Sequence, residues 1–476
     1  MLWIPVDRNL DMALNRQLYE QIRDRILRGE LRPCDKLPST RELAKELHLS
    51  RNVVLEAYDQ LLAEGFLMAE RGSGTYVAEG AYLEEAHGHY TAEDFLEAEE
   101  SAAEHAVIDF RSGIPALDAV PRKSWGKLSH EVWLETSAAA FGYGAPEGRL
   151  ELRRALAQYL SKTRGVRCLP EQIVMTSGAT QALTLAARLL LSAGDPVIIE
   201  DPITRDIQTI FKQSGAELYP VPTDEHGMRT SLLPQEMNPA FIFLTPSHQF
   251  PLGGTLSIQR RIQLVHYARE RGCYLVEDDY DIEFRHEGPP ISSLQGLEPE
   301  RVLYIGSFSK ILSPALRLGY LVLPRYLVEA CRSLKWFSDL HTSSLDQLVL
   351  ARYIESGGLE RHIAKMKKLY RSRRDVLLRA LKEAFGDEIE VTGQSTGLHC
   401  VVSFRGISFT EERLASLLDD GVKVYPVEYH TLVKGRHKHR IILGYGHLDA
   451  EQLREGVRRL KQGLSELRPY AAGRGG

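Results

Sequence analysis

One acidic segment divides this chain of 476 residues into two parts that we expect to fold separately. Residues 78–106 contain nine Asp and Glu residues, no Lys or Arg, and several alanines and glycines. Like charges repel one another and this composition buries little apolar surface, so we expect a solvated linker, partly helical around residues 92–103. A tail that binds a partner is the alternative. The segment predicts one domain at residues 1–77, an acidic linker at 78–107 and a second domain at 108–470.

The composition is that of a globular protein with more than one domain, with 43% hydrophobic and 26% charged residues. The net charge of −5 predicts no general attraction to nucleic acid or to acidic membranes. We see no signal peptide and no stretch of about 18 apolar residues, so we expect no membrane segment. The five cysteines suggest neither disulfides nor a metal site, which favours a reducing, cytoplasmic location. They are Cys34, Cys168, Cys273, Cys331 and Cys400.

Three helix patterns precede the acidic segment. Residues 15–27 carry apolar side chains at helical spacing, and Gly29 follows where that helix would end. The run Ser39-Thr40-Arg41-Glu42 is a capping box that opens a second, short helix. Ser50 caps a third helix, which has an apolar stripe over residues 53–61. The order predicts a small helical domain.

The third helix and the residues after it favour DNA binding. Arg51 and Asn52 would lie exposed in its first turn, where a recognition helix meets base edges. Residues 66–68 and 75–77 flank Arg71-Gly72-Ser73-Gly74, a pattern that predicts a two-stranded wing with a glycine-rich tip. The fold class is therefore a winged helix-turn-helix, mainly helical with a β wing. A small helical domain used for protein contacts would show the same stripes.

The net charge of this domain argues against DNA binding. Residues 1–77 contain eleven Lys and Arg against twelve Asp and Glu, a difference of −1, whereas DNA-binding domains are usually basic. We therefore expect the positive charge to be segregated onto one face.

The runs Leu37-Pro38-Ser39-Thr40-Arg41-Glu42-Leu43-Ala44 and Ser50-Arg51-Asn52-Val53-Val54 resemble those of the GntR regulators. The resemblance extends to about Val77 and implies double-stranded promoter DNA as a partner. The residues that match the DNA-contact positions of that family are Arg41, Ser50, Arg51, Asn52, Arg71, Gly72 and Gly74.

In the second domain, Lys310 follows an apolar run at residues 302–305 that suits a buried strand. A nucleophilic lysine must be desolvated or lie beside other cations, since a protonated amine does not attack. Ser307 and Ser309 offer hydroxyls, and Arg317 offers a planar fork for phosphate. The pattern predicts a cofactor-linked lysine, and a solvated surface lysine is the alternative.

Two further runs fit a cofactor site. Asp278 and Tyr280 follow a strand-like run at 274–276, and the carboxyl ends of strands line the ligand crevice of an open α/β sheet. Asp278 is thus placed to pair with a pyridinium nitrogen and Tyr280 with a ring hydroxyl. A solvated turn is the alternative. Residues 173–181 lead from a strand through Gly178 toward a helix-like stretch, which would offer free backbone N–H groups to an anion.

Together these elements resemble the fold-type I aminotransferases that use pyridoxal 5′-phosphate (PLP), from about Asp109 to Leu460. The resemblance implies an α/β domain with a mostly parallel sheet and a smaller C-terminal α/β subdomain. It makes Lys310 the catalytic residue that holds PLP as an internal aldimine, with Asp278 on the pyridine nitrogen and Tyr280 on the ring oxygen. It assigns the phosphate to Ser307, Ser309, Arg317, Gly178, Ala179 and Thr180, and to Tyr143 from the opposite subunit of a dimer.

In this order, the two domains resemble the MocR/GabR subfamily of GntR-type regulators over nearly the whole chain. The resemblance implies a PLP-dependent transcription regulator that senses PLP, an amino compound or both, through aldimine exchange at Lys310. It also implies a domain-swapped, head-to-tail homodimer. Two alternatives stay open: an active aminotransferase with an accessory N-terminal domain, and a regulator whose large domain has lost the cofactor and binds a ligand non-covalently.

Two departures from the aminotransferase pattern favour a sensor with little turnover. Thr204 stands where that family usually places an aromatic ring that stacks on the cofactor, and residues 247–253 replace its asparagine-containing loop. For the carboxylate of an effector, Arg440 and Arg205 are the candidates, because arginine binds carboxylates through two hydrogen bonds. Arg436 is a further rival, and we expect no metal site. His399 lies in a predicted strand, and we interpret it as a satisfied core residue.

Overall fold

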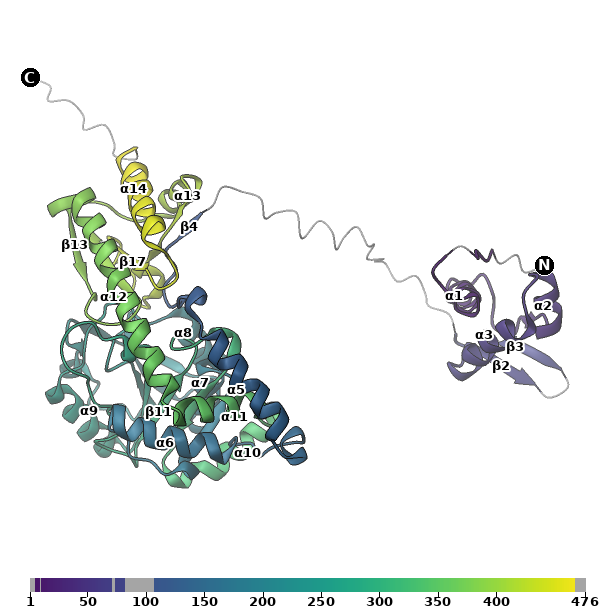
Figure 1. Ribbon diagram of the computed structural model, residues 1–476, viewed down its shortest axis with the longest axis horizontal. Helices are drawn as coiled ribbons and strands as arrows, with labels where there is room; N and C mark the ends of the chain where they lie inside the picture. The colour runs from purple at the N-terminus through teal and green to yellow at the C-terminus, as the bar shows by residue number, and fades with distance from the viewer. Residues whose placement is uncertain (1–4, 9, 71–72, 82–106, 467–476) are drawn as a thin grey trace, which may run out of the picture. The chain divides into compact units, whose positions relative to one another are not determined.

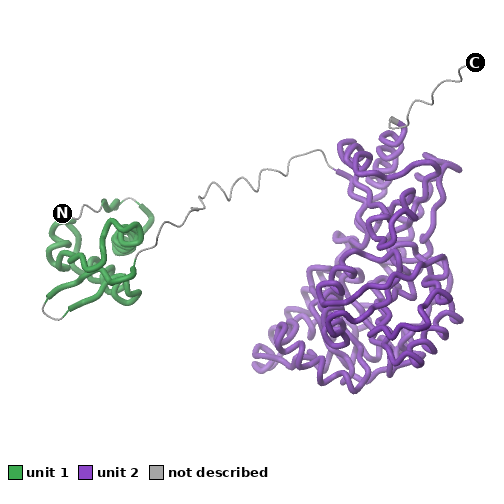
Figure 2. The backbone as a smooth tube through the Cα atoms, turned by 180° about the vertical axis from the view of Figure 1, so that it is seen from behind, with its two compact units in different colours: residues 1–104 green, residues 105–476 purple. Residues whose placement is uncertain are grey.

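The computed structural model describes residues 5–8, 10–70, 73–81 and 107–466. The chain forms two compact units, residues 1–104 and 105–476 (Figure 2). The predicted helical stretch at 92–103 lies outside the described residues.

The N-terminal unit is a winged helix-turn-helix, as predicted. Its capping box is present: Ser39 Oγ accepts from the backbone N–H of Glu42 at 3.3 Å, and Glu42 Oε2 accepts from that of Ser39 at 2.9 Å. Ser50 Oγ caps the third helix by accepting from Val53 N at 3.4 Å. The elements are α1 (Leu14–Leu27), β1 (Lys36–Leu37), α2 (Thr40–Glu46), α3 (Arg51–Ala63), β2 (Leu67–Glu70) and β3 (Gly74–Val77).

One strand of this unit was not predicted. The wing sheet has the order β1-β3-β2, with Lys36 opposite Tyr76 and Leu37 opposite Thr75. A two-residue strand shows no alternation along the sequence, so only its pairing with residues forty positions away reveals it. The core joins the three helices to the sheet and includes Leu18, Ile22, Ile26, Leu37, Val54, Tyr58, Leu61 and Val77.

The larger unit contains an eight-stranded, mostly parallel sheet in the order β5-β12-β11-β10-β9-β6-β7-β8. Only β12 and β8 run antiparallel to their neighbours. This confirms the predicted α/β class. The strands are β5 (Ile173–Thr176), β6 (Pro196–Asp201), β7 (Glu217–Asp224), β8 (Gly227–Met228), β9 (Phe241–Leu244), β10 (Tyr274–Asp279), β11 (Val302–Ser307) and β12 (Gly319–Val322).

Helices cover both faces of this sheet, which explains why its strands read as continuous apolar runs. In β11, Leu303 and Ile305 pack into one buried cluster together with Leu183 of α7, while Tyr304 packs into another together with Leu156 of α6. The helices are α5 (Arg122–Glu135), α6 (Leu150–Arg164), α7 (Ala179–Leu190), α8 (Arg205–Gln213), α9 (Ile258–Arg271), α10 (Val328–Asp339) and α11 (Ser344–Glu355).

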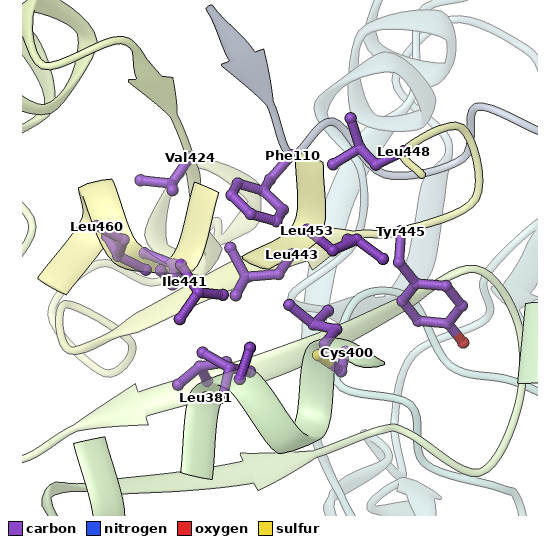
Figure 3. Close-up of a cluster of buried hydrophobic side chains, with 14 of the residues drawn as sticks. Phe110, Leu381, Cys400, Val424, Ile441, Leu443, Tyr445, Leu448, Leu453 and Leu460 are labelled. Atoms are coloured by element: carbon purple, nitrogen blue, oxygen red, sulfur yellow. The ribbon is translucent and has the colours of Figure 1, made fainter. Parts of the chain in front are cut away.

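A smaller C-terminal subdomain completes the unit, as expected. Its antiparallel sheet has the order β13-β14-β17-β16 and is covered by α12 and α14, which lie side by side (Figure 1). Figure 3 shows Ile441, Leu443 and Cys400 in its core beside Phe110. The elements are α12 (Gly358–Phe385), β13 (Ile389–Thr392), β14 (His399–Phe404), α13 (Glu411–Asp419), β15 (Val422–Lys423), β16 (Tyr425–Pro426), β17 (Arg440–Gly444) and α14 (Ala450–Glu466).

The first strand of the larger unit also belongs to this subdomain. Strand β4 (Ile108–Asp109) pairs in parallel with β15, although more than 300 residues separate them. The chain therefore passes through the C-terminal subdomain before it enters α5. Among the residues described, none of the helices combines the length and the apolar composition that crossing a membrane requires.

Candidate functional site

Four neighbouring strands bring the predicted cofactor residues to one edge of the large sheet. Asp278 of β10 lies opposite Ile305 of β11, and Gly319 of β12 pairs with both Ser307 of β11 and Thr176 of β5. Because β12 runs against its neighbours, its start lies beside their carboxyl ends. The turn after β5 therefore meets Arg317, which precedes β12, and the residues that follow β10 and β11 come to the same edge.

Lys310 is partly buried at this edge, after β11. A Cβ atom added to Gly113 would lie 3.0 Å from Lys310 Nζ, so only glycine permits the backbone to approach the amine this closely. Burial lowers the pKa of Lys310, the carboxylates of Asp281 and Asp278 act in the opposite direction, and Arg111 adds to the lowering. The result is an amine whose neutral, nucleophilic form is more accessible than that of a surface lysine.

Asp278 is buried, and its Oδ1 has no hydrogen-bond partner in the described part of the chain. Burial raises the pKa of Asp278 to about 7, and the carboxylate of Asp279 adds to the increase. An unsatisfied buried polar atom costs about 1–3 kcal/mol. A cationic ring nitrogen would remove that cost, so Asp278 fits the pyridine of PLP.

The turn after β5 forms a cradle for an anion. Gly178 precedes α7 with φ of 100°, a conformation that side-chain-bearing residues rarely adopt. A Cβ atom there would lie 2.6 Å from Nη2 of Arg317. The helix starts at Ala179, three residues earlier than the stretch expected from the sequence, so the N–H groups of Ala179 and Thr180 are in its first turn and have no partner within the helix.

Arg317 and two serines complete the cradle. Arg317 donates to the backbone oxygen of Ser177 and forms no ion pair among the described residues, so its guanidinium remains available to an anion. Ser307 Oγ accepts from Ser309 N at 3.1 Å and donates to Ser309 Oγ at 3.0 Å. The donors suit a phosphate group.

Tyr280 lies against a histidine that the sequence did not connect with it. His248 Nδ1 is 3.1 Å from Tyr280 Oη and 2.7 Å from Asp281 Oδ1, and the two rings stack with centroids 5.6 Å apart. His399 of β14 lies 5.1 Å from the His248 ring and donates from Nε2 to the backbone oxygen of Pro251 at 2.9 Å. The pairing of residues 248 and 281 spans 33 positions, and no periodicity signals it.

Other residues near Lys310 were also missed. Arg111 lies close enough to lower the pKa of Lys310, and a Cβ on Gly113 would lie 3.0 Å from Lys310 Nζ. Both follow β4, and the pairing of β4 with β15 brings them to the site. The backbone of Arg111 then lies against Gly444 of β17, a contact between distant segments that the sequence does not signal.

The structure does not place the remaining predicted residues beside Lys310. The side chain of Tyr143 is 82% exposed and meets His341 edge-on at 6.2 Å, and no hydrogen bond or ring contact links it to Lys310 within the described chain. Arg205 is exposed as the first residue of α8. Thr204 caps that helix, accepting from Asp206 N at 3.4 Å, which gives its hydroxyl a structural role where an aromatic was expected.

Arg440 lies at the start of β17 and lines a cavity of about 720 Å³. Lys310, Asp278 and Tyr280 are not among the residues that line it. The end of β17 that approaches Arg111 is Gly444, and four residues of strand span about 13 Å. The residues around the cavity are Asp201, Pro222, Thr223, Asp224, Glu225, Arg229, Leu252, Glu390, Thr392, Arg436, His437 and Arg440.

The N-terminal unit exposes its predicted DNA contacts. Arg41, Ser50, Arg51 and Asn52 lie exposed at the starts of α2 and α3. At the wing, Gly74 has φ of 133°, and a Cβ there would lie 2.9 Å from Cε of Lys36. Strand β1 places the cationic side chain of Lys36 beside the wing. Because this strand was not predicted, Lys36 was not identified as a candidate DNA contact. Arg71 and Gly72 lie outside the described residues.

Comparisons with known proteins agree with both units. Residues 14–77 match the family described as bacterial regulatory proteins, gntR family, and residues 105–460 match aminotransferase class I and II. The chain is 32% identical to the probable rhizopine catabolism regulatory protein MocR of Rhizobium meliloti, over 98% of this chain and 97% of that protein. It is 33% identical to the HTH-type pyridoxine biosynthesis transcriptional regulator PdxR of Corynebacterium glutamicum, over 81% and 82% respectively.

Among solved structures, the larger unit is similar to LysN, an α-aminoadipate aminotransferase of Thermus thermophilus complexed with N-(5′-phosphopyridoxyl)-L-leucine. The TM-score is 0.70 at 29% identity, over 76% of this chain and 93% of that one. The enzyme thus resembles one unit only, whereas MocR matches both units in the same order. The chain therefore belongs to the MocR-type transcriptional regulators, in which a GntR-family helix-turn-helix domain is joined to a domain of aminotransferase class I and II.

Proposed function

We propose that this protein is a PLP-dependent transcription regulator that binds double-stranded promoter DNA and senses PLP, an amino compound or both through amine exchange at Lys310. The observation that carries the proposal is the unpartnered, buried Oδ1 of Asp278 at the same sheet edge as Lys310. Such a pair suits a cofactor with a basic ring nitrogen and an aldehyde.

PLP supplies an aldehyde that reacts reversibly with primary amines. In this proposal Lys310 provides the resident amine, and its lowered pKa favours the neutral form that the reaction requires. Asp278 would pair with the ring nitrogen, and Tyr280 would bond the ring oxygen. The phosphate would be held by Ser307, Ser309, Arg317 and the backbone at Gly178, Ala179 and Thr180.

Exposed aromatic side chains support a homodimer. Trp133 and Phe141 lie 5.3 Å apart on the surface, and Tyr143 and Phe337 are more than 80% exposed. Large exposed apolar side chains that cluster mark interaction sites in soluble proteins. We propose a head-to-tail, domain-swapped dimer in which Tyr143 of each subunit reaches the phosphate bound by the other.

Regulation requires that binding of the effector and binding of DNA be thermodynamically coupled. An effector amine that took the place of Lys310 would leave Lys310 free of the cofactor, and it would alter DNA binding only if it bound two arrangements of the dimer unequally. Arg440 and Arg205 remain candidates for an effector carboxylate, and Arg111 joins them because it lies nearer to Lys310. The cytoplasm, where promoter DNA lies, is the proposed location.

Substitution of Lys310 tests the proposal. We expect the purified protein to absorb visible light after addition of PLP, and borohydride reduction followed by peptide mass spectrometry to locate the adduct on Lys310. Lys310→Ala should lose the absorption while circular dichroism stays unchanged. Lys335→Ala is a matched control, because Lys335 is also buried but pairs with Asp339 at 2.6 Å. A colourless wild-type protein, or an adduct on another peptide, would refute the proposal.

An active aminotransferase is the second candidate, because Lys310, Asp278 and Tyr280 share one sheet edge as such an enzyme requires. Thr204 argues against efficient turnover, since loss of a ring stacked on the cofactor costs about 0.5–1.5 kcal/mol of binding. Steady conversion of an amino donor and a keto acceptor at enzyme-like rates would favour this candidate over the regulator.

A further inference from the structure

His248, Asp281 and Tyr280 form a trio near Lys310 in which His248 and Asp281 are buried and Tyr280 is half-buried. The side chains of His248 and Asp281 are only 2% and 3% exposed. His248 Nδ1 lies 2.7 Å from Asp281 Oδ1 and 3.1 Å from Tyr280 Oη. One ring nitrogen thus faces both a carboxylate and a phenol.

The chemistry of the partners decides where the proton lies. An ionised carboxylate only accepts hydrogen bonds, so Nδ1 must carry the hydrogen that Asp281 receives. His248 Nε2 is buried and has no partner among the described residues, so no contact there competes with Asp281 for the hydrogen. The imidazole is therefore the tautomer with its hydrogen on Nδ1.

This tautomer determines what the hydroxyl of Tyr280 can do. The Nδ1 hydrogen goes to Asp281, the nearer partner, so Nδ1 has no free lone pair and Tyr280 cannot donate to it. No other hydrogen bond to the Tyr280 hydroxyl occurs within the described chain. Its own hydrogen is therefore left for an acceptor outside the protein.

Close packing holds the trio in place. A Cβ atom on Gly397 would lie 2.3 Å from Asp281 Oδ2 and 2.4 Å from His248 Cε1, so a larger residue at 397 would displace both. The ring of Phe250 lies 6.3 Å from that of Tyr280. Such packing removes the alternative side-chain positions that would let the hydroxyl turn away.

Several titratable and charged groups surround the trio, and they come from different elements. The carboxylates raise the pKa of Tyr280 in addition to the larger effect of burial, so the hydroxyl keeps its hydrogen. The groups are Asp278 and Asp279 of β10, Glu200 of β6, Lys310 after β11 and His399 of β14.

We infer that His248 is a positioning residue: with its tautomer fixed by Asp281, it holds Tyr280 as a hydrogen-bond donor to the ring oxygen of the cofactor. The inference rests on the proposed function, since it requires PLP at Lys310. It gives a role to residues 247–253, the loop that departs from the aminotransferase pattern. A hydrogen bond donated to the ring oxygen stabilises negative charge there, which lowers the affinity of the bound chromophore for a proton.

Asp281→Asn reverses the arrangement. The neutral amide no longer holds the hydrogen on Nδ1 as a carboxylate does, so the imidazole can carry it on Nε2. The lone pair of Nδ1 then faces the Tyr280 hydroxyl, 3.1 Å away, as an acceptor for its hydrogen. Tyr280 then turns its hydrogen toward His248 and away from the cofactor. A residue that only fills space would not produce this effect, because asparagine and aspartate have nearly the same shape.

The test is a pH titration of the visible absorption of full-length protein loaded with PLP. We expect Asp281→Asn to raise the apparent pKa of the chromophore by about 1, a tenfold change in proton affinity. Asp224→Asn is the matched control, since Asp224 pairs with Arg260 at 2.6 Å and is not part of the trio. Its titration should coincide with that of the wild type.

A second variant covers the possibility that Asp281→Asn does not fold, as judged by circular dichroism. His248→Gln removes Nδ1, because a glutamine amide reaches the place of Nε2 instead, and it should also raise the apparent pKa. Titrations of the folded variants that coincide with the wild type would overturn the inference. A wild-type protein that develops no absorption would instead contradict the proposed function.

Discussion

The two units present their candidate functional side chains in opposite ways. In the N-terminal unit Arg41, Arg51 and Asn52 are exposed, and the structure behind them is an ordinary apolar core. In the larger unit Asp278 is buried and Tyr280 half-buried at a sheet edge, where desolvation raises the pKa of both. DNA recognition adds contacts on a surface, whereas cofactor chemistry needs groups that are set before the ligand arrives.

The strongest test of this difference is Asp278→Asn. A charge-assisted hydrogen bond between buried groups contributes about 1.5–3 kcal/mol, so we expect PLP to bind roughly 10- to 100-fold more weakly. Equilibrium dialysis against PLP measures this. Asp339→Asn, which alters a carboxylate bound to Lys335, serves as the control. Equal PLP affinity in the wild type and Asp278→Asn would show that Oδ1 is not the ring-nitrogen partner.

Arg51→Ala applies the comparison to the exposed site. Losing one base contact should weaken binding to the operator by about 1–3 kcal/mol and relax base preference, without altering PLP absorption. A gel-shift titration with the protein's own promoter region measures the loss. Arg16→Ala removes an exposed arginine of α1 that pairs with Glu20, and it should have a smaller effect. Similar losses in both variants would indicate a general charge effect.

The raised pKa of Asp278 predicts a pH dependence for the cofactor-free protein. With a folded pKa of about 7 against an ordinary value of 3.8, the folded state holds a proton that the unfolded state has released between these values. Stability must then fall as the pH rises from about 4 to about 7. Asp278→Asn should flatten that decline, and thermal unfolding at about pH 5 and pH 8 without PLP would reveal it. A wild type and variant with parallel pH profiles would contradict the assignment.

The smallest expected effect concerns only the N-terminal unit. Ser39→Ala removes the capping box of α2 and should reduce the stability of that unit by about 1 kcal/mol. Amide hydrogen exchange, read separately for residues 14–77 and for the larger unit, would detect the change. Ser465→Ala, which removes an exposed hydroxyl bonded to the backbone of α14, is a suitable control. Faster exchange in both units would mean that their stabilities are coupled.

Local signals could be predicted from the sequence, and contacts that depend on register could not. The capping box at Ser39 and the apolar strand before Lys310 each lie within a few consecutive residues, so their patterns are visible along the chain. The pairing of β1 with β3 and that of His248 with Asp281 depend on how distant segments align. Arg440 shows the same limit: its residue type suits a carboxylate, but only the course of β17 shows which cavity it faces.

Strand β4 lies only a few residues along the chain from the surroundings of Lys310. The acidic segment leads directly into Ile108 and Asp109, and four residues after Asp109 comes Gly113, where an added Cβ would lie 3.0 Å from the Lys310 amine. The covalent path from the N-terminal unit thus passes beside Lys310 before it enters α5. A displacement of β4 against β15 would therefore reach the surroundings of the Lys310 amine within four residues of the chain.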